Sequence, residues 1–199
     1  MIPSSVPLPG SKHKPMKPFE QAAVVLSLAE ALKARGGWGG ETHVQKSVYF
    51  LQELLGVPTD FEFILFKHGP FSFDLRSALT MMEAEELIAW EPRRPYGPTL
   101  VRGRDADYLD RHFGLVGERH SREIDFVADK LRDKGVRELE KLATALFVAR
   151  EVDDASKRAA RIVELKPHIS LTEALDAVQT VSDLTAIVGA GAASSRVTC

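Results

Sequence analysis

Two segments about twenty residues apart carry the least ordinary side chains of this sequence. In the first, Gln45 and Tyr49 lie one helical turn apart, displaced by about 100° from the apolar stripe of the same segment. In the second, His68 precedes a Gly-Pro turn. Tyrosine combines rigid apolar area with a polar tip, which suits a recognition surface. The alternative is structural: Tyr49 at the edge of the core with its hydroxyl bonded, and His68 packing its ring in a turn.

Motifs for catalysis are missing from the sequence. It contains no Gly-x-Ser-x-Gly, no internal cysteine, and no glycine loop followed by Lys-Ser/Thr. None of the six histidines has the i, i+4 spacing with a nearby glutamate that a zinc protease needs, and none pairs with a cysteine. We therefore predict a protein that is not an enzyme, with no catalytic residues, no metal and no cofactor.

The composition is that of an ordinary globular protein. The 199 residues are 44% hydrophobic and 27% charged, with a net charge of -2, which favours neither nucleic acid nor membrane as a global partner. No apolar run approaches the roughly 20 residues of a membrane span. Prolines interrupt the N-terminus, which excludes a secretory signal, and the single cysteine is the last residue, Cys199. These features predict a cytoplasmic protein.

Prolines, glycines and apolar periodicity delimit the first elements. Residues 1–16 hold four prolines without apolar periodicity, which predicts a disordered tail. A helix is predicted from near Pro18 to the glycine run 36–40, which no helix accepts. Thr42 and Gln45 fit a capping box and predict the start of a second helix. The apolar stripe of this helix consists of Val44, Val48, Leu51 and Leu55.

The next elements alternate strand and helix. Aromatic and branched residues predict a strand over 61–66, and residues 68–70 predict a turn. Ser72 is suited to cap a third helix. Short apolar runs at 87–90 and 99–102, separated by proline and glycine, predict a two-stranded hairpin.

The fold class predicted is mainly α with a small β hairpin. The element order over 17–104 is that of a winged helix-turn-helix, and this half is followed by a helical bundle over 105–185, packed on it. The small residues of 186–199 predict a flexible tail.

A winged helix raises the alternative of nucleic-acid binding. Arg93 and Arg94 at the predicted hairpin tip, with Arg102 and Arg104, are the candidate phosphate contacts. However, residues 42–104 contain seven basic and eight acidic side chains. Because phosphate contacts by Lys and Arg dominate affinity for DNA, this charge disfavours that alternative.

The two opening segments resemble a known family. Gln45-Lys46-Ser47-Val48-Tyr49-Phe50-Leu51-Gln52, followed by Phe66-Lys67-His68-Gly69-Pro70-Phe71-Ser72, is similar to the Panacea, or SocA-like, domain and to YwgA-like proteins. The likeness covers residues 19–104. It implies a small cytoplasmic bacterial protein that binds another protein, in the best-understood branch as an antitoxin that neutralises a toxin or delivers it to a protease.

The leading hypothesis is therefore a non-enzymatic protein-interaction module, such as an antitoxin or a defence-associated adaptor. Its partner would be a toxin-like protein or a protease component. The alternative is a winged-helix transcriptional regulator. The residues predicted to bind the partner are Gln45, Lys46, Tyr49, His68, Gly69, Pro70 and Phe71.

Overall fold

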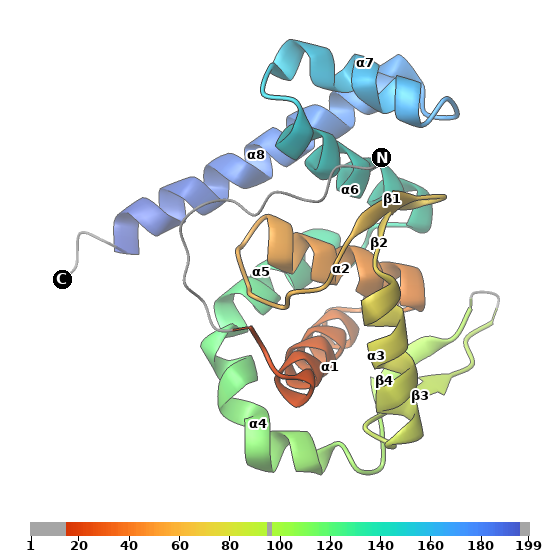
Figure 1. The fold of residues 1–199 in the computed structure, drawn as a ribbon, viewed down its shortest axis with the longest axis vertical. Helices are drawn as coiled ribbons and strands as arrows, with labels where there is room; N and C mark the ends of the chain where they lie inside the picture. Colours follow the sequence, from red (N-terminus) through yellow and green to blue (C-terminus); the bar gives the residue numbers. More distant parts are fainter. Residues whose placement is uncertain (1–14, 95–96, 196–199) are drawn as a thin grey trace.

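The computed structural model describes residues 15–94 and 97–195, and within them the protein is mainly helical with two small hairpins (Figure 1). The helices are α1 (Pro18–Ala34), α2 (Glu41–Glu53), α3 (Phe73–Ala84), α4 (Asp107–Arg119), α5 (Ser121–Leu131), α6 (Val136–Glu151), α7 (Ala155–Leu165) and α8 (Leu171–Ser195). Antiparallel strands β1 (Ile64–Phe66) and β2 (Gly69–Phe71) form one hairpin, and β3 (Ile88–Glu91) and β4 (Thr99–Arg102) the other. The predicted fold class is confirmed.

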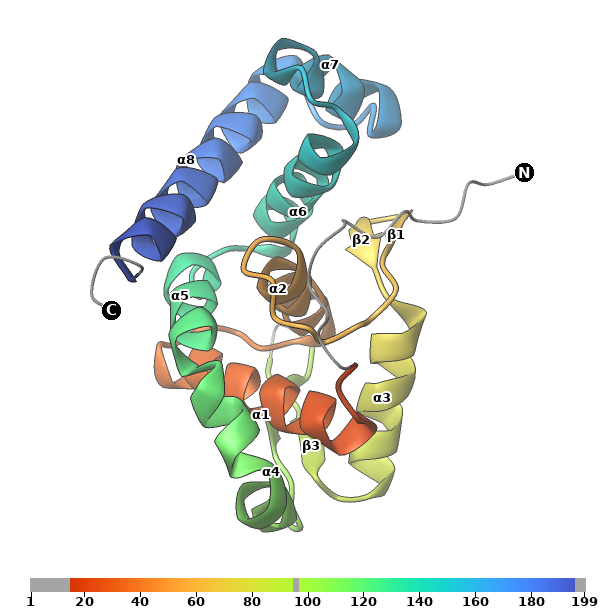
Figure 2. The ribbon, with the colours of Figure 1, turned by 60° about the vertical axis from the view of Figure 1, so that its left-hand side comes forward.

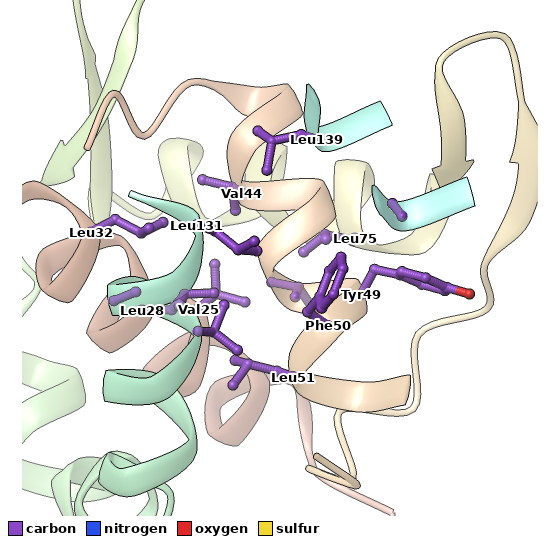
Figure 3. Close-up of a cluster of buried hydrophobic side chains, with 14 of the residues drawn as sticks. Val25, Leu28, Leu32, Val44, Tyr49, Phe50, Leu51, Leu75, Leu131 and Leu139 are labelled. Carbon is purple, nitrogen blue, oxygen red and sulfur yellow. The ribbon is translucent and has the colours of Figure 1, made fainter. Parts of the chain in front are cut away.

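Helix α2 lies at the centre of the molecule. It contacts α1, α5, α6 and β2, and Figure 2 shows α6, α7 and α8 on one side of it and α1, α3 and α4 on the other. As a result, nine consecutive residues of α2, His43 to Leu51, are buried. Figure 3 shows the core around it, with labelled side chains that include Val25, Leu28, Leu32, Val44, Phe50, Leu51 and Leu131.

Several element boundaries follow the sequence signals. Helix α1 begins at Pro18, and Ser72 caps α3 by accepting a hydrogen bond from the Leu75 amide at 3.1 Å. The predicted capping box at the second helix is wrong: Gly40 is the N-cap, α2 begins at Glu41, and the Gln45 side chain bonds elsewhere.

The segment predicted as one strand and a turn is a complete hairpin. Its first strand is shorter than predicted, and Gly69 and Pro70 belong to the second strand, with Ile64 opposite Phe71 and Phe66 opposite Gly69. Gly69 has a φ of +83°, which an L side chain rarely adopts. The chain reverses over only Lys67 and His68, so this tight reversal produces pairing that the sequence signals missed.

The predicted flexible tail is wrong for residues 186–195, which belong to helix α8, and residues 196–199 lie outside the described ranges. Helix α8 starts at the Ser170–Glu173 capping box, buries Ala177, Val181 and Leu184, and continues through Ser195. Residues 1–14 of the predicted N-terminal tail, and Cys199, lie outside the described ranges. Within those ranges, no helix has the length and apolar character needed to cross a membrane.

Candidate functional site

Gln45 joins α2 to the chain that leaves β2. Its side-chain Nε2 donates to the Ser72 carbonyl at 2.9 Å, and its Oε1 accepts from the Ser72 amide at 3.0 Å. The residue is fully buried. Gln45 therefore satisfies both backbone polar groups of Ser72 where no water reaches them.

Lys46 satisfies a backbone carbonyl two residues earlier, within the hairpin. Its Nζ donates to the Pro70 carbonyl at 2.6 Å, and the residue is 1% exposed. Burial lowers the pKa of Lys46 to about 8, with the nearby carboxylate of Glu140 acting against this shift and the ammonium of Lys166 adding to it. At pH 7 Lys46 is therefore a mostly protonated cation inside the protein.

Tyr49 is a core residue. It is fully buried, and its ring packs edge-on against Phe63 with centroids 5.0 Å apart. Figure 3 shows the ring extending away from the other labelled side chains. Burial raises the pKa of its hydroxyl. The structure thus corrects the expected surface face of Gln45, Lys46 and Tyr49, because all three are covered by neighbouring elements.

A second anchor of the hairpin comes from the C-terminal helices. Lys166, at the end of α7, donates from Nζ to the carbonyls of Phe66 at 2.5 Å and Lys67 at 2.7 Å. Glu140 of α6 lies beneath them, with its Oε1 3.7 Å from Lys166 Nζ and 3.2 Å from His168 Nε2. Its Oε2 lies 3.7 Å from His68 Nδ1. The carboxylate offsets the charge of the buried lysines.

Sequence reasoning missed Glu140 and Lys166 as parts of this arrangement. They lie at least 69 residues beyond the hairpin in a chain with 28 acidic and 26 basic side chains. Spacing therefore gave no reason to pair them with residues 66–68.

The outer face of the hairpin is apolar. We define the hairpin patch as Ile64, Phe66, Phe71 and Phe73. Phe66 is 50% and Phe73 49% exposed, and the three phenylalanine rings contact one another with centroids 5.1 to 5.9 Å apart. The Arg76 guanidinium lies 5.9 Å from the centroid of the Phe71 ring. Such a cluster of exposed rings is uncommon on a protein that has no partner.

The four candidate nucleic-acid arginines differ in their surroundings. Arg93 and Arg94 are exposed beside the β3–β4 turn. Arg102 bonds Glu30 at 3.0 Å and also the carboxylates of Asp107 and Asp110. These bonds raise the pKa of Arg102.

Arg104 also pairs with carboxylates. Its side chain contacts Glu86 at 2.7 Å and Asp105 at 3.5 Å. Two of the four arginines are thus already held by acidic groups that a phosphate would have to displace.

The residues predicted to bind a partner divide into two groups. Gln45, Lys46, Tyr49, Gly69 and Pro70 are buried, whereas His68 and Phe71 reach the surface of the hairpin. No group of three or more His, Cys, Asp or Glu side chains in the described part of the chain is arranged to hold a metal ion. No protein-family model matches the sequence, and no curated protein matches it.

Proposed function

We propose that this protein is a non-enzymatic protein-interaction module that binds its partner through the hairpin patch. The observation that carries the proposal is the group of contacting phenylalanine rings left at the surface by β1, β2 and the start of α3. Aromatic side chains supply much of the binding energy at protein interfaces because they bury large rigid areas.

The anchoring of the patch supports the same proposal. Gln45, Lys46 and Lys166 bond the backbone of residues 66, 67, 70 and 72. A surface held in one conformation loses little entropy when a partner binds. The buried polar residues thus favour recognition without touching the partner.

The resemblance to the Panacea family supports the class of partner. It favours a toxin-like protein or a protease component, with this chain acting as an antitoxin or an adaptor. The nucleic-acid alternative is less well supported, because carboxylates hold Arg102 and Arg104. A salt titration with duplex DNA tests that alternative, since binding dominated by phosphates weakens steeply with salt.

Site-specific crosslinking in the native host tests the proposal. A photoreactive residue replaces Phe73 in one variant and Leu115 in another. Leu115 is a matched control because it is an apolar residue, 75% exposed, on α4. We expect one recurring protein to crosslink at position 73 and not at position 115. The crosslinked protein, once purified, should bind the full chain and lose affinity for Phe73→Asp.

Two outcomes would contradict the proposal. One is crosslinking at position 73 to nucleic acid or to no recurring protein. The other is an unchanged affinity of the purified partner for Phe73→Asp, which would place the contact elsewhere.

A further inference from the structure

A narrow groove borders the hairpin patch. It lies between the start of α2, the hairpin and α3, and has a volume of about 190 Å³. Its lining residues are Glu41, Thr42, Lys46, Phe66, Lys67, His68, Gly69, Phe71 and Arg76. Small-molecule pockets span roughly 300 to 1,000 Å³, so the groove suits a single chemical group better than a whole metabolite.

The groove carries more positive than negative charge. Lys46, Lys67 and Arg76 line it, and the one carboxylate among the lining residues is Glu41. Glu41 Oε1 lies 3.4 Å from Arg76 Nε at an exposed position. A contact of this kind is worth little and is easily exchanged for another anion.

Lys46 adds a cation that water screens weakly. Within the described residues its Nζ donates a hydrogen bond to the Pro70 carbonyl alone, although an ammonium has three protons to donate. The buried Glu140 lies behind the groove, and Lys166 beside it contributes a second positive charge. The buried part of this region thus holds two lysines against one carboxylate, which leaves it suited to a further negative group.

Apolar and cationic groups meet at this groove. Phe66 and Phe71 belong both to its lining and to the hairpin patch. A ligand that fills both must therefore present a negative group directly beside an apolar one.

We propose that the groove binds a side-chain or C-terminal carboxylate of the partner protein, while an adjacent aromatic or aliphatic side chain packs on the hairpin patch. The inference rests on the proposed function and adds the chemistry of the bound segment. Lys67 and Arg76 pair with the carboxylate at the rim, and Lys46 attracts it from below. A carboxylate is the anionic group that an unmodified protein segment presents, on Asp, on Glu or at its C-terminus.

Selection of random peptides by display on the full-length chain tests this inference. We expect enriched peptides to place Asp, Glu or a free C-terminus next to an aromatic or aliphatic residue. Affinity of the strongest synthetic peptide is then measured by fluorescence anisotropy. Replacing its acids by amides, or capping its C-terminus, should weaken binding about tenfold or more.

Charge reversal on the protein provides the second arm. Lys67→Glu and Arg76→Glu should each weaken the same peptide about tenfold or more, since like charges oppose each other at the site. Lys130→Glu is the matched control: Lys130 lies on α5 with its Nζ 5.8 Å from the ring of Phe126, and its reversal should leave affinity unchanged. Circular dichroism establishes that all three variants fold.

The outcomes separate this inference from the function it rests on. Peptides without acidic enrichment, affinities unaffected by Lys67→Glu and Arg76→Glu, or binding only to phosphorylated peptides would each overturn the carboxylate site. If such peptides still lose affinity for Phe66→Ser or Phe73→Ser, the protein-binding function of the patch stands. If no peptide binding depends on Phe66 or Phe73, both proposals fail.

Discussion

Helix α2 and the hairpin patch reverse the usual distribution of polar and apolar side chains. In α2, Gln45 and Lys46 are buried to 1% exposure or less. In the patch, Phe66 and Phe73 are about half exposed. Unpaired polar groups are costly inside a protein, so the buried ones must serve a partner group. Here that group is the backbone of the hairpin and of the residue that follows it, held by hydrogen bonds from both residues.

The polar core and the apolar surface are therefore parts of one arrangement. Strands β1 and β2 have three residues each, so they form only a short ladder of backbone hydrogen bonds. Hydrogen bonds from the side chains of Gln45, Lys46 and Lys166 add to this ladder. They hold the rings of the patch in place. The following predictions test whether the buried side acts on stability and the exposed side on binding.

Removing the buried carboxylate of Glu140 should have the largest effect on stability. Glu140→Gln leaves Lys46 and Lys166 buried without a compensating charge, and should lower the free energy of unfolding by about 3 kcal/mol. Urea denaturation measures this loss. The control Glu138→Gln removes a half-exposed carboxylate that pairs with Lys134 at 2.7 Å, and should cost about 0.5 kcal/mol or less. Equal losses in the two variants would mean that Glu140 is solvated.

Truncating the buried side-chain amide of Gln45 should have the second-largest effect on stability. Gln45→Ala leaves the N–H of Ser72 unpaired, while its C=O keeps the bond from the Arg76 amide at 3.2 Å, and should lower the free energy of unfolding by about 2 kcal/mol. Gln179→Ala is the control, since its amide donates to Asp183 on the exposed face of α8. A loss below about 0.5 kcal/mol for Gln45→Ala would show that water replaces its bonds.

The dependence of stability on pH should reveal the lowered pKa of Lys46. Burial lowers its pKa from 10.5 to about 8. Between pH 8 and 10 the unfolded chain therefore holds a proton that the folded chain releases, so the free energy of unfolding rises with pH. The contribution is at most about 1.4 kcal/mol per pH unit. Above pH 10 the raised pKa of Tyr49 acts in the opposite direction, because only the unfolded tyrosine ionises there.

Comparison with Lys46→Met isolates this contribution. Urea denaturation at several pH values between 8 and 10 should give a shallower slope of stability against pH for the variant than for the parent. Parallel slopes would mean that Lys46 keeps its ordinary pKa and is hydrated in the folded protein.

Substitution in the patch should have the smallest effect on stability. Phe73→Ser should change the free energy of unfolding by no more than about 0.5 kcal/mol, because the ring is already half in water. Phe50→Ala in the core, where Phe50 is 1% exposed, should cost about 3 to 5 kcal/mol. Thermal denaturation compares the two. A large loss for Phe73→Ser would make the patch part of the fold rather than a surface for binding.

Apolar periodicity and caps predicted much of the fold. The stripe of Val44, Val48 and Leu51 identified one buried side of α2, and all three are fully buried. Pro18 and Ser72 located two helix starts because their signals are local.

The candidate site depended on contacts that no local pattern encodes. Gln45, Lys46 and Tyr49 were interpreted as a second, exposed face, since an amphipathic helix normally has one. Their burial arises from β2 and from α6, whose Glu140 lies 94 positions after Lys46 in the sequence. The family resemblance and the antitoxin role remain predictions.

The bonds from Lys166 to the hairpin have a consequence during synthesis of the protein. Lys166 lies 100 residues after Phe66, so the ribosome makes the hairpin long before it makes this anchor. Until Lys166 has emerged, the carbonyls of Phe66 and Lys67 lack these bonds, whereas Lys46 and Gln45 can already bond Pro70 and Ser72. The hairpin that carries the rings of the patch therefore gains its last anchor only when most of the chain has been translated. A chain truncated before Lys166 lacks this anchor.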